Sequence, residues 1–134
     1  MDIDNLLCGR DVLVVEDELL IALDVERIVL DCGAMACQIV RGVPALEVFI
    51  DDHNASNIVI VDERSFHRDP SVFTALIESF SAAIVLTTSR ERPQQLIGNA
   101  RVCFVQKPFV STDIVTALIE QLRDQRPTAG IANT

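Results

Sequence analysis

Short apolar runs alternate along the chain with longer segments in which apolar residues recur at helical spacing. The run at residues 58–61 consists entirely of β-branched residues without intervening polar positions, a pattern typical of a strand covered on both faces of a parallel sheet. Together the runs predict five strands, at residues 11–15, 35–40, 58–61, 83–86 and 102–106. The run at 58–61 leads directly into Asp62, so a buried strand would deliver one carboxylate to its C-terminal end.

Each predicted strand is followed by a segment that can form a helix. Residues 18–32 form the first, with a core stripe at helical spacing and Gly33 at its end. The others are expected at residues 45–52, 71–79, 93–98 and behind a cap at Ser111 or Thr112, with a polar loop at residues 63–69. Five strand–helix units predict an α/β fold, a doubly wound, five-stranded parallel sheet flanked by helices and joined by right-handed crossovers.

The first predicted helix carries more apolar surface than one contact with a sheet needs. Leu19, Leu23 and Leu30 lie beside its core stripe. Two interpretations stay open: the surplus is a surface for docking a partner, or the helix is broadly buried.

The composition agrees with one folded domain, since 134 residues with 49% apolar content can bury a full core. We expect the domain at residues 1–125 and a flexible tail at residues 126–134. A net charge of −9 argues against direct binding of nucleic acid, which needs a basic face.

The chain shows no basic segment followed by an apolar core at its start, and no apolar run of membrane-spanning length. We therefore expect a cytoplasmic protein without a membrane partner. The four cysteines form no C-x-x-C pair and neither histidine lies near one, which favours reduced thiols over a zinc site.

Ionisable and hydroxyl side chains follow four of the predicted strands: Glu16 and Asp17, Asp62, Thr87, and Lys107. Ligands of parallel sheets bind at the carboxyl ends of the strands, so these groups would meet at one edge. Two carboxylates ~4 Å apart repel by roughly 4 kcal/mol at an effective dielectric of 20, so the cluster requires a cation. Oxygen ligands favour Mg²⁺. Lys107 and Thr87 could hold two oxygens of a phosphoryl group on Asp62.

Four motifs, VLVVEDE, IVIVDE, VLTTS and FVQKPF, resemble in order and spacing those of the receiver domain of two-component response regulators, over residues 11–123. The resemblance implies the flavodoxin-like receiver fold in a stand-alone, single-domain protein. It implies a phosphoacceptor that assists its own phosphoryl transfer and hydrolysis, rather than an enzyme. The donor would be a histidine kinase or phosphotransfer protein. Output would pass to an unknown downstream protein or through a phosphorelay, with a homodimer left open.

The same resemblance assigns roles to single residues. Asp62 would be the phosphoacceptor, and Asp17 and Asp62 would ligate Mg²⁺ directly. The main-chain carbonyl of Arg64 would be the third protein ligand, and Glu16 would act through a bound water. Two further residues would grip the phosphoryl oxygens, namely Thr87 and Lys107. The switch residues would be Thr87 and Phe104, and the bond from Lys107 to Pro108 would be cis.

The segment after Asp62, ERSFHRDP, departs from the pattern of the family. The side chain of Arg64 could cover the site there and alter the lifetime of the phosphoryl group. This departure motivates an alternative, a degenerate receiver that acts as a phosphorylation-independent interaction module. Taken alone, Asp17 could simply cap the first helix.

A third hypothesis is an aspartate-nucleophile phosphatase or a nucleotide-binding fold. The phosphatase would need D-x-D after the first strand, where this chain has Glu16, Asp17 and Glu18. The nucleotide-binding fold would need a glycine-rich first turn, and no glycine lies between Arg10 and Cys32.

Overall fold

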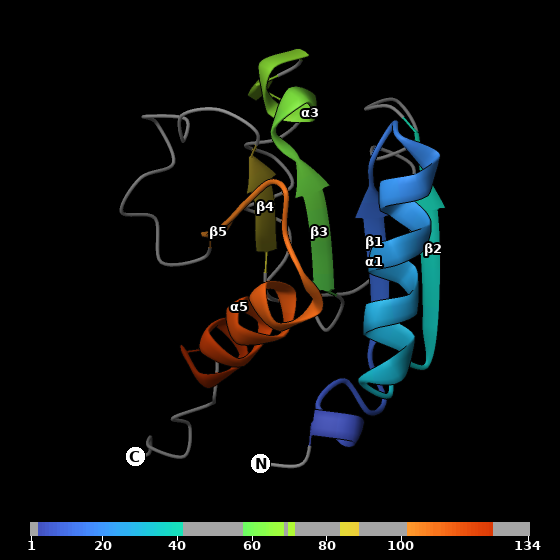
Figure 1. Ribbon diagram of the computed structural model, residues 1–134. Coiled ribbons are helices and arrows are strands. Elements are labelled where there is room, and N and C mark those ends of the chain that lie inside the picture. Colours follow the sequence, from blue (N-terminus) through green and yellow to red (C-terminus); the bar gives the residue numbers. More distant parts are fainter. Residues whose placement is uncertain (1–2, 42–57, 69, 72–83, 89–101, 125–134) are drawn as a thin grey trace.

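The computed structural model describes residues 3–41, 58–68, 70–71, 84–88 and 102–124. Within these residues, five strands form one sheet in the order β2-β1-β3-β4-β5, and every neighbouring pair is parallel (Figure 1). The strands are β1 (Asp11–Val15), β2 (Ala36–Val40), β3 (Ile58–Asp62), β4 (Ile84–Thr88) and β5 (Val102–Gln106). The five predicted strands are confirmed, with β4 ending two residues later than expected.

The strand order reverses direction at β1, which lies between β2 and β3. In open α/β sheets this reversal marks the crevice in which ligands bind. The register pairs Val15 with Val61, so Glu16 and Asp62 follow at the same level of the sheet. The topology thus places the first two acidic motifs side by side.

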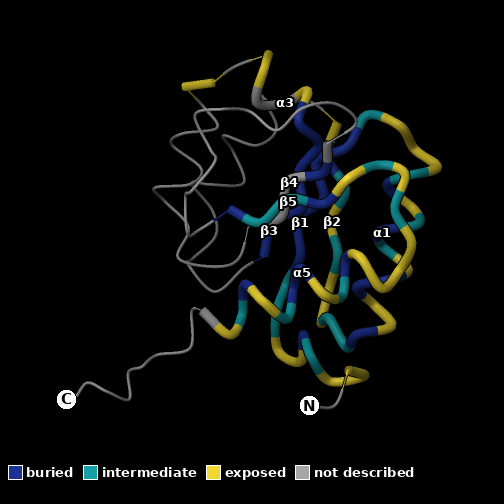
Figure 2. Tube along the Cα trace, turned by 60° about the vertical axis from the view of Figure 1, so that its left-hand side comes forward, coloured by how far each residue is buried: buried dark blue, intermediate teal, exposed yellow. Residues whose placement is uncertain are grey.

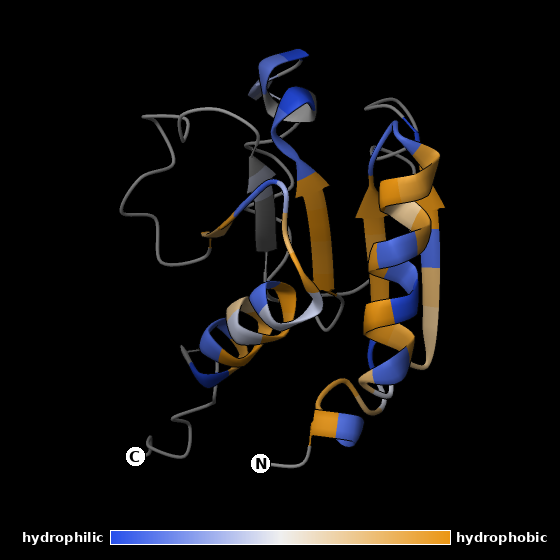
Figure 3. Cartoon of the chain, viewed as in Figure 1, coloured by the Kyte–Doolittle hydropathy of each residue, from blue (hydrophilic) through white to orange (hydrophobic). Residues whose placement is uncertain are grey.

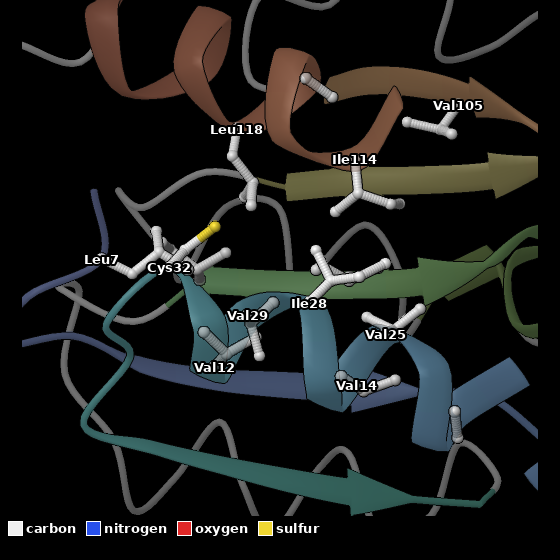
Figure 4. Close-up of a cluster of buried hydrophobic side chains, with 14 residues drawn as sticks. Leu7, Val12, Val14, Val25, Ile28, Val29, Cys32, Val105, Ile114 and Leu118 are labelled. Carbon is white, nitrogen blue, oxygen red and sulfur yellow. The ribbon is translucent and has the colours of Figure 1, made fainter. Parts of the chain in front are cut away.

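Two long helices, α1 (Leu19–Asp31) and α5 (Ser111–Asp124), pack on the sheet around one hydrophobic core. Figure 4 shows Val25, Ile28 and Val29 of α1 gathered with Ile114 and Leu118 of α5. Burying each such side chain contributes about 1.5–3 kcal/mol. The expected core stripe of the first helix is confirmed.

Strand β3 is buried along its whole length, and β1 is buried from Val12 to Val15 (Figure 2). Leu13 and Val59 are as fully buried as Val12 and Ile58, which point to the opposite face because side chains alternate along a strand. Both faces of these strands are covered, as the continuous apolar runs predicted.

Gly33 ends α1 for two physical reasons. Its φ of 90° lies in the left-handed region that side chains rarely adopt. A Cβ atom there would also lie 2.6 Å from the backbone oxygen of Asp4, in the segment that contains the short 3-10 helix η1 (Ile3–Asn5). The chain can therefore turn tightly from α1 into β2 only with glycine at this position.

The start of α5 differs from the expected cap. Ser111 is already helical, and the carboxylate of Asp113 accepts a hydrogen bond from the backbone N–H of Val110 at 2.9 Å. The N–H of Asp113 in turn donates to the carbonyl of Val110 at 3.0 Å. Asp113, the third residue of α5, therefore closes the first turn in place of a serine or threonine cap.

Residues 63–68 form a short helix, α3 (Glu63–Arg68), so the polar loop expected there was wrong. The acid Glu63 lies in its first turn and the basic residues His67 and Arg68 in its last, which matches the helix dipole. Arg64 and Arg68 are four residues apart, so the helix places them on one face. Because α3 begins directly after β3, this face lies close to the end of that strand.

Several predictions fall on residues outside the described ranges. These are the helices at 45–52 and 93–98, most of the helix at 71–79, and the tail at 126–134. The division into a domain and a tail stays a prediction. Among the described residues, no helix is long and apolar enough to cross a membrane.

Candidate functional site

The carboxyl ends of the strands bring the expected side chains together. Glu16 follows β1, Asp62 ends β3 in register with Thr87 of β4, and Lys107 follows β5. Glu16, Asp62 and Thr87 are buried, with exposed fractions of 4%, 3% and 2%. Figure 3 shows this edge as hydrophilic segments after the apolar strands β1 and β3.

Lys107 forms ion pairs with acids at the ends of β1 and β3. Its Nζ lies 2.9 Å from Oε1 of Glu16 and 2.9 Å from Oδ1 of Asp62. Burial lowers the pKa of this amine, but the hydrogen bonds to Asp62 and Glu16 outweigh burial and raise it above the ordinary value. Lys107 is therefore a charged ammonium group that bridges both acids and offsets part of their negative charge. Its peptide bond to Pro108 is cis, as the resemblance implied.

Arg64 binds the other oxygen of Asp62. Its Nε donates to Oδ2 of Asp62 at 2.7 Å, and its terminal nitrogen lies 3.3 Å from Oε2 of Glu16 and 3.4 Å from Oε1 of Glu18. The hydrogen bond to Asp62 raises the pKa of Arg64. Both carboxylate oxygens of Asp62 are thus bound by positively charged groups.

Asp17 pairs with Arg68, the second arginine on the same face of α3. The hydrogen bond from Arg68 lowers the pKa of Asp17. The N-terminal cap position of α1 is occupied by Glu18, without a side-chain capping bond. Asp17 therefore does not cap the helix, and its carboxylate belongs to the charged cluster.

The two proposed switch residues lie on neighbouring strands. The Thr87 hydroxyl is 3.5 Å from the carbonyl oxygen of Val61, a long contact for a hydrogen bond. The hydroxyl is thus directed at the backbone of β3 beside Asp62. Phe104 is half-buried in β5, opposite Leu86 in the register.

Sequence reasoning assigned Arg64 chiefly its main-chain carbonyl and missed Arg68. The carbonyl of Arg64 lies within α3, and its role as a ligand stays a prediction. The spacing of Arg64 and Arg68 directly after Asp62 was visible in the sequence, but only a helix at residues 63–68 turns both toward the acids.

Glu16, Asp17 and Asp62 offer carboxylate oxygens, which are the ligands that a hard cation prefers. Within the described ranges, no three acidic, histidine or cysteine side chains are arranged to hold a metal ion. The same carboxylates instead bind two guanidinium groups and one ammonium group. The carboxylates of the cluster are therefore stabilised by nearby positive charge, which Arg64, Arg68 and Lys107 provide.

No protein-family model matches the sequence, and a search of curated proteins found no relative. Solved structures do match. A response regulator receiver domain protein from Bacillus halodurans superposes with a TM-score of 0.67 at 15% identity, covering 85% of this chain and 97% of the other. SdrG from Sphingomonas melonis matches with a TM-score of 0.60 at 23% identity, covering 84% of this chain and 96% of SdrG.

A variant of the anti-anti-sigma factor PhyR from Bartonella quintana matches with a TM-score of 0.67 at 24% identity. This match covers 89% of the present chain and 50% of PhyR, so the chain spans about half the length of that protein. The other two structures match over nearly their whole length. The protein therefore has the fold of response regulator receiver domains.

Proposed function

We propose that the protein is a single-domain response regulator that accepts a phosphoryl group on Asp62 from the histidine of a kinase or phosphotransfer protein. The observation that carries this proposal is the position of Asp62, a buried carboxylate at the end of β3 with Lys107 2.9 Å from one oxygen. A buried carboxylate held by a charged amine at the switch point of the sheet supports a role in chemistry beyond packing.

The phosphoryl transfer would need little more than positioning and charge neutralisation. One oxygen of Asp62 forms a bond to phosphorus while the bond from phosphorus to the donor's imidazole nitrogen breaks, and the imidazole keeps the electron pair. Lys107 would bind one phosphoryl oxygen. Thr87 would turn its hydroxyl from the carbonyl of Val61 to a second one. Hydrolysis by water at phosphorus would restore the carboxylate.

The proposed cofactor is Mg²⁺, which would supply neutralising charge to the phosphoryl oxygens. Asp17 and Asp62 would hold it directly, with the main-chain carbonyl of Arg64 and, through a water, Glu16. The chemistry of these oxygen donors supports the assignment.

Phosphorylation would add roughly −1.5 to −2 charge at Asp62 and draw Thr87 and Lys107 toward it. Phe104, on the strand beside Thr87, would change its rotamer with this movement. Output would pass to a downstream protein by contact, through a phosphorelay, or through a homodimer.

The donor protein would dock on α1. Leu19, Leu20, Leu23 and Leu30 are 44–84% exposed, so the helix is not broadly buried. Beside them lies a pocket of about 640 Å³ lined by Glu18, Leu20, Ile21, Asp24, Lys107, Pro108 and Phe109. Since Lys107 belongs to both the pocket and the acidic cluster, a partner seated here would bring its histidine next to Asp62.

A second candidate is a degenerate receiver that binds partners without phosphorylation. The pairing of both Asp62 oxygens, with Lys107 and Arg64, favours it. In such a protein the ion pairs would be permanent, and the α1 surface would bind its partner in a single state.

Acetyl phosphate with Mg²⁺, followed by intact-mass measurement, separates the two candidates. We expect the wild type to gain the mass of one phosphoryl group and Asp62→Asn to gain none. No added mass in the wild type, or equal addition to both proteins, would favour the degenerate receiver.

A further inference from the structure

We propose that the side chain of Arg64 is a tethered cation that competes with Mg²⁺ for the carboxylates of this site, so that metal binding must displace it from Asp62. This inference rests on the proposed function, because it takes Mg²⁺ as the cofactor. It concerns a residue of this chain and the state of the site before any phosphoryl group arrives.

The guanidinium group of Arg64 reaches three carboxylates at once: Asp62 at 2.7 Å, Glu16 at 3.3 Å and Glu18 at 3.4 Å. A planar fork with several donors can bridge acids in this way, whereas a lysine ammonium acts as a point charge. Arg64 therefore takes the neutralising role that a divalent ion would have among the same oxygens.

Lys107 holds Oδ1 of Asp62 and Arg64 holds Oδ2, so a metal ion that bonds to Asp62 must share an oxygen with one of these positive groups. Like charges at such a distance repel, and the repulsion is strong where solvent is partly excluded. A carboxylate oxygen has room for two contacts, so this repulsion, rather than a lack of acceptor sites, favours the departure of one of the two side chains.

The exposure of the two side chains decides which one leaves. The side chain of Arg64 is 44% exposed and that of Lys107 is 11% exposed. Arg64 can swing into solvent from the first turn of α3 without opening the core. Arg68 acts in the same sense on Asp17, where it binds a second proposed ligand.

The consequence is a site that is closed without metal. Arg64 keeps the buried acids from repelling one another and at the same time binds an oxygen that would attack phosphorus. The domain would then become a phosphoacceptor only at Mg²⁺ concentrations sufficient to displace the arginine.

Isothermal titration of Mg²⁺ into metal-free protein tests the inference without a phosphodonor. We expect Arg64→Ala to bind Mg²⁺ about tenfold more tightly than the wild type. Arg27→Ala is the control for net charge, because Arg27 pairs with Asp24 and Asp31 on the outer surface of α1. It should bind Mg²⁺ as the wild type does. Equal or weaker binding by Arg64→Ala, a matching gain in Arg27→Ala, or no binding by any of these proteins overturns the inference.

A measurement on the wild type covers the case in which Arg64→Ala does not fold. The Nε–H resonance of Arg64 should exchange slowly with water in metal-free protein and lose that protection when Mg²⁺ is added. A resonance unchanged at saturating Mg²⁺ would contradict displacement. Since neither readout uses phosphoryl transfer, failed phosphorylation with tighter metal binding in Arg64→Ala would reject the proposed function alone.

Discussion

Arg64 donates from its Nε to Asp62, two residues earlier in the chain, over 2.7 Å. This short pair is possible because β3 ends at Asp62 and α3 begins at the next residue, so the arginine folds back over the sheet edge. Lys107 approaches the other carboxylate oxygen from β5. The proposed phosphoacceptor is therefore held between two cations from different parts of the chain.

Replacing Lys107 with alanine should weaken both the fold and the proposed chemistry. Asp62 and Glu16 are buried and would each lose an ammonium partner at 2.9 Å. Each acid keeps Arg64 as a second partner, so the cost is that of the lost hydrogen bonds to charged groups, about 1.5–3 kcal/mol. We expect urea denaturation to show a loss of this size and phosphorylation by acetyl phosphate to slow at least about tenfold.

Arg27→Ala is the matched control for that substitution, since the ion pairs that Arg27 forms with described residues, Asp24 and Asp31, are exposed. It should change the free energy of unfolding by no more than about 0.5 kcal/mol. Equal stability of Lys107→Ala and the wild type would contradict the assignment of Lys107 to the cluster.

The pair of Asp17 and Arg68 should make stability depend on pH in the acid range. Arg68 lowers the pKa of Asp17 below its ordinary value of 3.8, so the unfolded state binds this proton more readily than the folded state. The contribution is present above pH 3.8 and is lost as the pH falls through the lower, folded pKa. Because the pair is partly exposed, it contributes only about 0.2–1 kcal/mol.

The check is the difference in unfolding free energy between wild type and Arg68→Ala, measured from pH 7 down to pH 2. The difference should be constant at neutral pH and shrink toward zero in acid. A difference that grows as the pH falls has the wrong sign for this pair.

The four cysteines should differ in reactivity. Cys8 is exposed, Cys32 is buried, and Cys37 and Cys103 are half-buried, all as free thiols. Burial also raises the pKa of Cys37 to about 12, so it forms little thiolate at neutral pH. A thiol reagent should modify one cysteine quickly in native protein and four in denaturant. Two or more fast thiols in native protein would show that the packing around Cys32, Cys37 or Cys103 differs from that described.

The apolar surface of α1 should serve the partner and not the fold. Leu20 is 84% exposed, so Leu20→Ser should leave stability within about 0.5 kcal/mol of the wild type. It should slow transfer from a phosphorylated kinase that labels the wild type, and leave labelling by acetyl phosphate unchanged.

Met35→Ser provides the control, because Met35 is also exposed, at 71%, but does not line the pocket beside Lys107. If Met35→Ser slows transfer from the kinase as much as Leu20→Ser does, the docking surface is not the one proposed.

The strands of the sheet were predictable because most of them are marked by a continuous apolar run in their own short segment of sequence. Continuous β-branched runs such as residues 58–61 are typical of buried strands, and parallel strands bring their carboxyl ends to one edge. This geometry alone predicts that Glu16, Asp62 and Lys107 lie together. The cis bond before Pro108 followed from the resemblance, not from the local pattern.

The start of α3 could not be predicted in the same way. Residues 63–68 are mostly polar and carry no apolar stripe, so the usual helical pattern is absent. The helix depends on its charged ends and on the ion pairs of Arg64 with Asp62 of β3 and of Arg68 with Asp17, which follows β1. These contacts exist only in the folded sheet, which is why the sequence pattern does not predict the ion pairs of the two arginine side chains.

Borohydride trapping tests the central claim most directly, since it reduces an aspartyl phosphate to homoserine and marks the acceptor residue itself. After treatment with acetyl phosphate and Mg²⁺, peptide mapping should find this conversion at position 62 alone, and it should vanish in Asp62→Asn. Trapping at Asp17 or another acid, or no conversion in fully folded wild type, would contradict the account.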